Sequence, residues 1–478
     1  MLLGVLPTAA CTSEAPLGSI GKIGSTQDAG PRTEVVEATV VRAEGRNTYT
    51  VSWDTPEPTD AQLVYGEAQA QDHVVEGTSS DDGLHHEAEL LGLAGGVDWQ
   101  VTATSRSETV LYTTDPLALT ADPPPADLPA ISMTTEPTDA VSGFAVALLA
   151  YEPIPVIALI DREGRYVWWQ SAPSIAAYRV LYDAPSHSVV WLAYAGENST
   201  VLWRCALDGQ PEVVATLGAR THHDLTPDPK GGWYALAYDE HEVERHDEDR
   251  TDGSGDDSTG DDDEEVTVVA DQLLHISADG SEVRTVWRSW DEFPYTDEPD
   301  PDVTSMDWPH TNSVSVDPET GDVLLSLLRL NTLAMVDPST GLSVWTMGGD
   351  DSDWTFPDGE AFAHQHSPLL VDGDSRLAIF DNGLDDASDP AEAAVYDLDW
   401  DTLTATRSWS YDQGGAHTNI TTGSAIPVGD AGSVLVSWGS DPTLTQVSAS
   451  GEVEWQLEFD LRCLGYVSQT TDLGGAAW

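Results

Sequence analysis

Short strands that end in tryptophan recur through the C-terminal two-thirds of this chain, with glycine-containing turns between them. They contain Trp168, Trp203, Trp287, Trp345, Trp409 and Trp455. Their intervals are uneven, but they have the size of one propeller blade or of a multiple with insertions. Such a repeat buries its apolar face only against its neighbours, so the pattern predicts a β-propeller.

A second set of positions repeats in the same region. It reads His223-Asp224-Leu225, Asn312-Ser313-Val314, His366-Ser367-Pro368-Leu369 and Asn419-Ile420-Thr421, and His310-Thr311-Asn312 returns as His417-Thr418-Asn419. In a propeller the innermost strand of each blade begins at the mouth of the central channel. Residues at one repeat position therefore converge around the axis, and histidines far apart in sequence become neighbours.

The N-terminal third has another pattern. Residues 33–122 alternate with period 2, as in Val35–Val41, Thr48–Trp53 and Val97–Thr104, which predicts the short strands of a β-sandwich. Trp53 and Trp99 make this segment resemble a fibronectin type III module. The proline run that starts at Pro123 is a stiff linker. We therefore expect an all-β protein with a linker at 1–32, a sandwich at 33–122 and a propeller at 128–478.

Charge excludes several classes of partner. The chain has 83 acidic against 19 basic residues and a formal charge of -64, which argues against binding to nucleic acid or to anionic membranes. A hydrophobic content of 40% indicates a globular chain. Part of the acidic excess lies in residues 244–265, which we expect to be a disordered loop. A calcium-binding loop is the alternative, although the fixed ligand spacing is missing.

Cysteine is rare, so no disulfide framework is expected. Cys11 follows Leu6-Pro7-Thr8-Ala9-Ala10, which resembles the cleavage and lipid-attachment site of a bacterial lipoprotein. No later segment has the ~20 apolar residues of a membrane span. We expect an exported protein, periplasmic or at the cell surface and lipid-anchored at Cys11. The alternative is an N-terminal tail with an incidental cysteine.

Several motifs in a shared order resemble the bacterial arylsulfate sulfotransferase family. They are Thr221-His222-His223-Asp224, His310-Thr311-Asn312-Ser313, Ser326-Leu327-Leu328-Arg329, Asp337–Gly349, Gln365-His366 and Phe380-Asp381-Asn382-Gly383. The resemblance implies a six-bladed propeller after a small sandwich. It also implies transfer of a sulfuryl group from an aryl sulfate to an acceptor phenol, without a nucleotide sulfate donor, a metal or another cofactor.

By this resemblance His366 is the nucleophile and forms a sulfohistidine. Sulfuryl transfer, like phosphoryl transfer, develops negative charge on peripheral oxygens, so the remaining residues position the group and neutralise charge. Arg329 supplies a permanent positive charge. His310 donates to the oxygens or protonates the departing phenolate, and Asn312 donates an amide hydrogen bond.

One residue of the His222-His223 pair is the remaining clamp or proton-transfer group, and the repeat position favours His223. We expect His222, Asn382 and Thr422 to contact the substrate, although the family's threonine falls at either Thr421 or Thr422. The Asp317–Gly321 turn is one residue longer than in the family pattern. That length leaves open whether Arg329 keeps its place at the channel.

Two other functions fit the same residues. One is a zinc or copper site built from His222, His223, His310 and His366 with Asp224 as a carboxylate ligand. The other is a propeller that binds a ligand without turnover. An arginine in the cluster favours an anionic substrate over a metal cation, and turnover separates an enzyme from a binding module.

Overall fold

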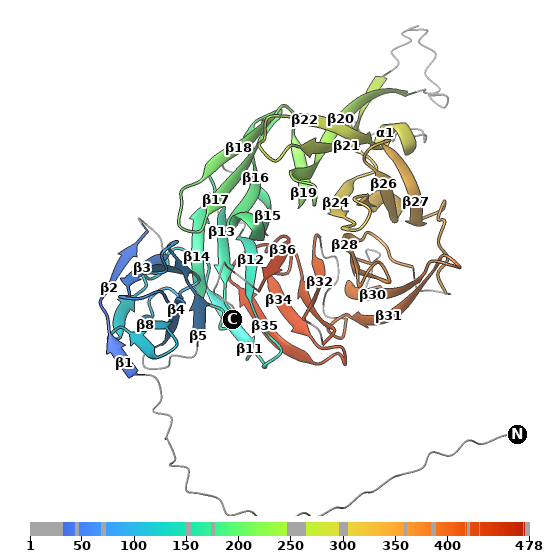
Figure 1. The fold of residues 1–478 in the computed structure, drawn as a ribbon. Coiled ribbons are helices and arrows are strands. Elements are labelled where there is room, and N and C mark those ends of the chain that lie inside the picture. Colours follow the sequence, from blue (N-terminus) through green and yellow to red (C-terminus); the bar gives the residue numbers. More distant parts are fainter. Residues whose placement is uncertain are drawn as a thin grey trace, which may run out of the picture.

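The computed structural model of this chain is built almost entirely from β-strands (Figure 1). It describes residues 32–43, 47–67, 73–149, 155–173, 177–245, 264–295, 305–357, 361–383, 389–415, 417, 421–429, 431–471 and 473. Within these ranges the helices are short: α1 (Ser289–Glu292) and the 3-10 helices η1 (Ala184–Ser186) and η2 (Leu328–Leu330). None is long and apolar enough to cross a membrane.

The N-terminal strands form two sheets. One has the order β1 (Arg32–Val35), β9 (Val110–Thr113), β8 (Asp98–Arg106), β4 (Gln62–Glu67) and β5 (His73–Glu76), with β10 (Leu117–Thr120) also paired to β8. The other has the order β2 (Ala38–Arg42), β3 (Tyr49–Asp54), β7 (His85–Leu90) and β6 (Thr78–Ser79). The assignment of this part as fibronectin type III-like stays a prediction.

Alternation along the strands builds the core between these two sheets. In β8 every second residue is buried, among them Trp99 and Val101. Trp53 of β3 donates its indole N–H to Ser105 Oγ of β8 at 2.8 Å, which links the sheets. The single strand predicted over Val35–Val41 was wrong, because the chain leaves one sheet after β1 and enters the other at β2.

Strands β11 to β36 form six sheets in the described residues. The first two are β36 (Val467–Thr470), β12 (Phe144–Leu149), β13 (Val156–Ile160) and β14 (Tyr166–Ser171), then β15 (Ala177–Asp183), β16 (Ser188–Gly196), β17 (Ser199–Ala206) and β18 (Glu212–Leu217). The third is β19 (Thr221–Pro227), β20 (Trp233–Arg245), β21 (Glu264–Ile276) and β22 (Val283–Arg288), with β23 (Ser305–Asp307) beside β21.

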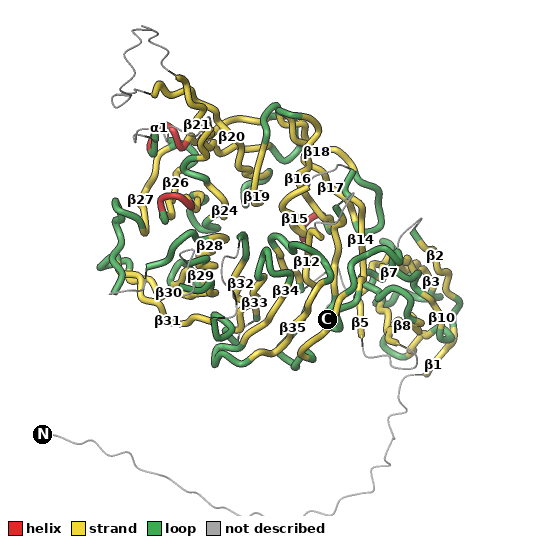
Figure 2. The backbone as a smooth tube through the Cα atoms, turned by 180° about the vertical axis from the view of Figure 1, so that it is seen from behind, coloured by secondary structure: helices red, strands yellow, loops and turns green. Residues whose placement is uncertain are grey.

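The fourth and fifth sheets are β24 (Thr311–Val316), β25 (Val323–Leu327), β26 (Thr332–Asp337) and β27 (Leu342–Gly348), then β28 (His366–Val371), β29 (Arg376–Asp381), β30 (Glu392–Asp399) and β31 (Thr404–Tyr411). The sixth is β32 (Ser424–Val428), β33 (Ser433–Ser437), β34 (Thr443–Val447), β35 (Val453–Phe459) and β11 (Ile131–Thr135). The first strand of each sheet as written faces the centre, and these inner strands contact one another in sequence (Figure 2). The arrangement is propeller-like, and assignment as the family's six-bladed propeller stays a prediction.

The tryptophan-containing segments are strands, as predicted. β14, β22, β27, β31 and β35 are each the fourth strand outward from the centre, whereas β17 is the third. This difference in position is one source of the uneven intervals in the sequence. The polar repeat also falls as predicted on the inner strands β19, β24 and β28, and its last member, Asn419-Ile420, lies outside the described residues.

The structure tests the predictions on the acidic run and on the cysteines only in part. The acidic run predicted as a loop from 244 to 265 has strands at both ends, because Glu244 pairs with Glu265 in the β20–β21 hairpin. Residues 246–263 and Cys11 lie outside the described residues, so disorder, export and lipid attachment stay predictions. Cys205 and Cys463 do not pair with each other in a disulfide.

Both ends of the chain close the propeller-like ring. The first strand after the linker, β11, pairs antiparallel with β35 at the outer edge of the last sheet. The last strand, β36, pairs antiparallel with β12 at the inner edge of the first sheet. Each of these two sheets therefore contains strands from opposite ends of the segment.

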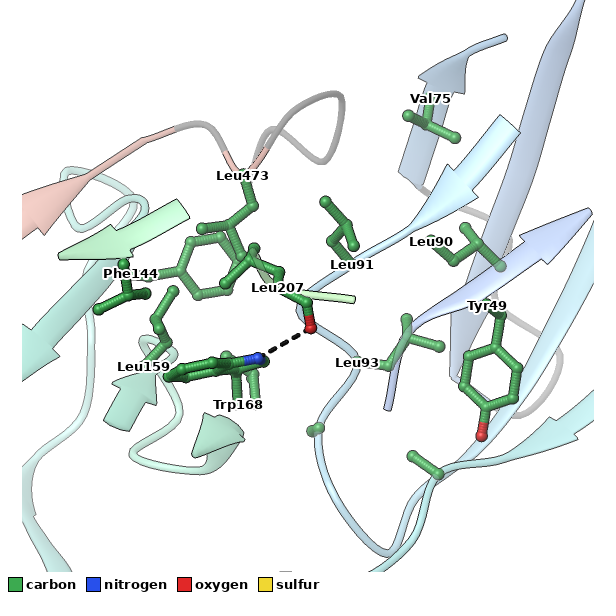
Figure 3. Close-up of a cluster of buried hydrophobic side chains, with 14 of the residues drawn as sticks. Tyr49, Val75, Leu90, Leu91, Leu93, Phe144, Leu159, Trp168, Leu207 and Leu473 are labelled. Carbon is green, nitrogen blue, oxygen red and sulfur yellow. Dashed lines mark hydrogen bonds between the residues drawn. The ribbon is translucent and has the colours of Figure 1, made fainter. Parts of the chain in front are cut away.

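A shared hydrophobic cluster joins the sandwich to the ring (Figure 3). Leu91 and Leu93 from the sandwich belong to the same cluster as Trp168 and Leu207 from the ring. The carbonyl of Leu207 accepts hydrogen bonds from Trp168 Nε1 at 2.9 Å and from Thr48 Oγ1 at 3.2 Å. Leu207 thus contacts both parts of the chain through its backbone and its buried side chain.

Truncating Leu207 should destabilise the protein measurably. Leu207→Ala removes a side chain that is 3% exposed and leaves a cavity, so we expect the free energy of unfolding to fall by about 2–5 kcal/mol. Leu342→Ala makes the same change at a side chain that is 57% exposed and should alter it by less than about 0.5 kcal/mol. Urea denaturation followed by tryptophan fluorescence tests both variants, and equal effects would contradict the packing role of Leu207.

Candidate active site

Three of the inner strands begin with an irregularity. β19, β24 and β28 each pair with the next strand through a register shift near their first residues. His223, His310 and Ser367 have positive φ angles of 52°, 61° and 50°, which residues with a Cβ adopt rarely. Bulges of this kind redirect side chains and are frequent beside active sites. The predicted histidines therefore lie at the irregular ends of the inner strands.

Three of the four predicted histidines form a cluster. The rings of His223 and His310 meet edge to face with centroids 4.8 Å apart. A charge on His310 would disfavour a charge on His366, and His366 and His310 have the same effect on His223. The structure thus brings together side chains from β19, the start of β24 and β28, as the repeat predicted.

Hydrogen bonds fix the tautomer of His366. Its Nδ1 lies 2.7 Å from Asn382 Oδ1 and 3.2 Å from the carbonyl oxygen of His364. Asn382 donates its Nδ2 to the Thr422 carbonyl at 3.0 Å, which turns Oδ1 toward the ring. Because both neighbours of Nδ1 are acceptors, Nδ1 carries the proton. The lone pair of neutral His366 is then on Nε2, the nitrogen that can attack an electrophile.

Burial keeps these rings neutral. Burial lowers the pKa of His366 to about 4, a charge on His310 acts in the same direction, and the hydrogen bond that His366 donates to Asn382 opposes both. Burial also lowers the pKa of His223 well below its usual value, as do the neighbouring His222, His310 and His366. At neutral pH both rings therefore have an available lone pair.

His222 faces away from this cluster. Its Nδ1 contacts His223 Nδ1 at 2.9 Å, its Nε2 lies 3.0 Å from Asp271 Oδ1, and its ring stacks on Tyr238 at 4.2 Å. Both nitrogens of His222 are therefore next to protein groups. The geometry places His223, not His222, against His310, in line with the preference drawn from the repeat.

His310 and Asn312 each have a buried or half-buried partner. His310 Nδ1 bonds to Asp307 Oδ2 at 2.5 Å, which leaves Nε2 as the free ring nitrogen. Asn312 donates its Nδ2 to the carbonyl of Gln365 at 2.8 Å, and its buried Oδ1 has no hydrogen-bond partner among the described residues. One of the two N–H groups of the Asn312 amide is thus used for a protein carbonyl, and donation of the other to substrate stays a prediction.

Arg329 is placed differently from the prediction. It lies in η2 with an exposed side chain, and no contact in the described part of the chain joins it to a histidine. Its backbone N–H donates to the Pro309 carbonyl at 3.1 Å, so it is next to the loop that carries His310. The side chain lines a cavity of about 490 Å³ together with Trp308 and Phe293. The extra residue of the Asp317–Gly321 turn is absorbed within that turn, because Val316 and Val323 on either side of it still pair.

Asn382 and Thr422, which we predicted to contact substrate, hold the ring of His366 in place. Asn382 orients the His366 ring, and its amide is held by the Thr422 carbonyl. Thr422 has a positive φ of 63°, and its buried Oγ1 has no hydrogen-bond partner in the described residues. Thr421 is exposed. Of the two threonines, Thr422 is the one placed next to the site.

The carboxylate considered as a metal ligand has another partner. Asp224 pairs with Arg179 Nε at 2.8 Å and accepts the Val314 N–H at 2.9 Å and the Leu225 N–H at 2.8 Å. Across the described ranges, no three His, Cys, Asp or Glu side chains converge closely enough to hold a metal ion.

Three residues near the site had no predicted role. Asp307 lies three residues before His310, but nothing in the sequence indicated that it bonds this ring. Asp271 lies outside every motif and reaches His222 only through the fold. Tyr466 donates its hydroxyl to the Asn312 carbonyl at 2.8 Å, and its ring centroid is 6.2 Å from that of His366. Only their position in the ring of strands identifies these residues.

The fold and the histidine cluster agree with a comparison of sequences. A profile of the arylsulfotransferase (ASST) family matches residues 133–460, more than half of the chain. The chain belongs to this family. The residues matched include the histidine cluster, Arg329, Asn312 and Asn382.

Other comparisons add little. No curated protein matches the chain. Solved structures with some likeness include TolB from Acinetobacter baumannii (9% identity, TM-score 0.39, 80% of each chain) and the Malassezia sympodialis allergen Mala s 1 (11%, 0.36, 71% of this chain and 96% of that one). Apo AztD from Citrobacter koseri gives 10% identity and a TM-score of 0.35 over 88% and 99% of the two chains.

The ionisation of His366 can be measured without substrate. Because the pKa of His366 is lowered to about 4, its ring should remain neutral and protonated at Nδ1 from pH 7 to about pH 5. Long-range ¹⁵N–¹H spectra of histidine-labelled protein test this, with His366→Gln identifying the signal. Contact with Asp54 raises the pKa of exposed His85, so that ring should titrate above 6.5 in the same sample. A His366 signal that titrates near 6.5, or one with the Nε2–H tautomer, would contradict the geometry.

Proposed function

We propose that this protein transfers a sulfuryl group from an aryl sulfate ester to an acceptor phenol, with a sulfohistidine at His366 as the intermediate. The observation that carries the proposal is the environment of His366 in a member of the arylsulfotransferase family. A buried, neutral imidazole with Nδ1 held by Asn382 presents Nε2 as a nucleophile. Nucleophilic catalysis requires this combination of an available lone pair and a fixed ring.

The first half of the reaction forms the intermediate. His366 Nε2 attacks sulfur, the bond between sulfur and the phenolic oxygen breaks, and the electron pair leaves with that oxygen, which takes up a proton. The product is an imidazolium that has the sulfuryl group on Nε2 and the original proton on Nδ1. Asn382 Oδ1 accepts from this proton at 2.7 Å and so stabilises the positive ring. In the second half a phenol oxygen attacks the same sulfur, loses its proton, and releases neutral His366.

The remaining residues would bind the charged oxygens and the aromatic ring. Negative charge on the sulfuryl oxygens favours N–H and positively charged donors around the group, which is the role proposed for His310 and Arg329. Arg329, Trp308 and Phe293 line one cavity, together with Glu292, Asp350 and Asp351, so an aromatic ring can pack there next to a guanidinium. In this scheme Asn312 orders the Gln365 carbonyl that precedes the nucleophile, and Thr422 holds Asn382 through its backbone.

Acceptor dependence is the first test. Release of 4-nitrophenol from 4-nitrophenyl sulfate should accelerate when a second phenol is added, because the sulfohistidine is discharged by an acceptor. With donor alone, intact-mass analysis should show one sulfuryl adduct per chain, and peptide mapping at mildly alkaline pH should place it on His366. His366→Gln should lose both the adduct and the turnover.

Four outcomes would count against the proposal. Release that is insensitive to acceptor would indicate a sulfatase. No release with any acceptor would favour a binding module. An adduct on His223 or His310, or one that persists in His366→Gln, would contradict the assignment of the nucleophile. Loss of activity on chelation, together with recovery of about one zinc or copper ion per chain, would favour the metal site instead.

Replacement of Arg329 tests the charge clamp. Arg329→Ala should fold normally, because the side chain is exposed, and should slow formation of the adduct by about 10²–10³-fold, as expected for the loss of one well-placed donor. Arg204→Ala is the matched control, since Arg204 lies on β17 away from the site and pairs with Glu212. Stopped-flow release of 4-nitrophenol in a single turnover measures both rates. An unchanged rate in Arg329→Ala would contradict the charge clamp. It would mean that the Arg329 side chain stays exposed in η2 during catalysis.

A further inference from the structure

Asp271, His222 and His223 form a continuous chain of contacts behind the histidine cluster. Asp271 Oδ1 lies 3.0 Å from His222 Nε2, an ion-pair distance, but neither atom forms a hydrogen bond of regular geometry within the described residues. The contact is close but bent. His222 Nδ1 then lies 2.9 Å from His223 Nδ1. The line runs from a buried carboxylate on β21 to the one histidine of the pair that contacts His310.

Packing holds every member of this chain in place. Asp271 is fully buried, its Oδ2 accepts the Thr311 N–H at 2.6 Å, and its own N–H donates to Ser289 Oγ at 2.9 Å. His222 is 3% exposed and stacks on Tyr238 with centroids 4.2 Å apart. A buried carboxylate and a buried imidazole are costly unless they have partners. Here each is the partner of the other.

The chain determines where the protons lie. A carboxylate oxygen only accepts, so a carboxylate 3.0 Å away favours the proton of neutral His222 on Nε2, on the side of Asp271. The lone pair of His222 is then on Nδ1, and the contact with His223 requires that His223 Nδ1 donate. Neutral His223 consequently has its lone pair on Nε2. This is the arrangement by which a carboxylate fixes the tautomer of a catalytic histidine in hydrolases, with one additional imidazole inserted.

We propose that His222 and Asp271 are positioning residues that hold His223 as the group that exchanges a proton with the phenolic oxygen in both halves of the reaction. This inference rests on the proposed sulfuryl transfer. It assigns His222 a role through His223, not through contact with substrate. His310 keeps the role of donor to the sulfuryl oxygens, which its Nε2 fills in the imidazolium form, because Nδ1 donates to Asp307.

The proton balance closes over one cycle. In the acceptor half, His223 Nε2 takes the phenol proton as the phenol oxygen bonds to sulfur, and the S–N bond electrons return to His366. The products are an aryl sulfate anion, neutral His366 and a protonated His223. In the donor half the steps reverse, and protonated His223 gives its Nε2 proton to the departing phenolate. Positive charge on His223 is shared through His222 with Asp271, so the carboxylate stabilises the protonated form.

Binding of an aryl sulfate changes the charge next to His223, and this change allows the ring to exchange a proton. Burial and the neighbouring imidazoles lower the pKa of His223, so its ring is neutral before substrate binds. An aryl sulfate brings a negative charge close to that ring and favours the protonated form. A proton-transfer group needs both states within reach.

The test compares donors with different leaving groups. Phenolate is a poor leaving group and needs a proton from His223, whereas 4-nitrophenolate is stable without one. In Asp271→Asn and His222→Phe, single-turnover release from phenyl sulfate should therefore slow by about 10²-fold or more, and release from 4-nitrophenyl sulfate by less than about tenfold. His222→Phe keeps the ring stacked on Tyr238, so it continues the test if Asp271→Asn does not fold.

The matched control is Asp228→Asn. Asp228 contacts His275 Nε2 at 3.1 Å in the same sheet, remote from the cluster, so its loss should leave both donors at the wild-type rate. If Asp271→Asn and His222→Phe slow release from both donors by the same factor, or from neither, the proposed positioning of His223 is wrong. These residues then only support the fold. Failure of the underlying function is distinguishable, because the wild-type protein would then form no adduct at His366 with either donor.

Discussion

Two buried carboxylates hold the first residues of β24, the inner strand on which the site is built. Asp271 of β21 accepts the Thr311 N–H, and Asp224 of β19 accepts the Val314 N–H. The bulge at the start of β24 disturbs its pairing with β25, and a buried N–H without a partner costs about 1–3 kcal/mol. Side-chain carboxylates from another sheet replace the missing partners. As a result, the positions of β19, β21 and β24 depend on one another.

The histidine cluster depends on the same contacts. Asp224 follows His223 directly in the chain, and Asp271 contacts His222, so the groups that fix the backbone also fix the rings. Burial raises the pKa of Asp224, and the Arg179 guanidinium and two backbone N–H groups oppose that effect. The stability of the ring and the geometry of the site are therefore not separable at these positions. A substitution of Asp224 would affect both.

The sequence predicted the parts of this arrangement that repeat. Its inner-strand pattern identified His223, His310 and His366, because each blade places the same strand position at the channel. It did not identify Asp271 or Asp307, since their contacts with histidine cross between strands or depend on a loop conformation that has no motif. Nor could it place Arg329, whose position is set by the 3-10 turn after β25 and not by strand alternation. The single strand predicted over Val35–Val41 failed for a related reason, because alternation does not show where a chain changes sheets.

Ring closure by strands from both ends has a consequence for the order of folding. Strands β12, β13 and β14 of the first sheet precede the other five sheets of the ring in the chain, but the innermost strand of that sheet, β36, follows them all. Until then β12 has an unpaired edge on the side that will face the channel, and such an edge can pair with another chain. Cooperative closure of the ring must therefore wait until β36 has been synthesised, and the edge of β12 stays available to other chains until then.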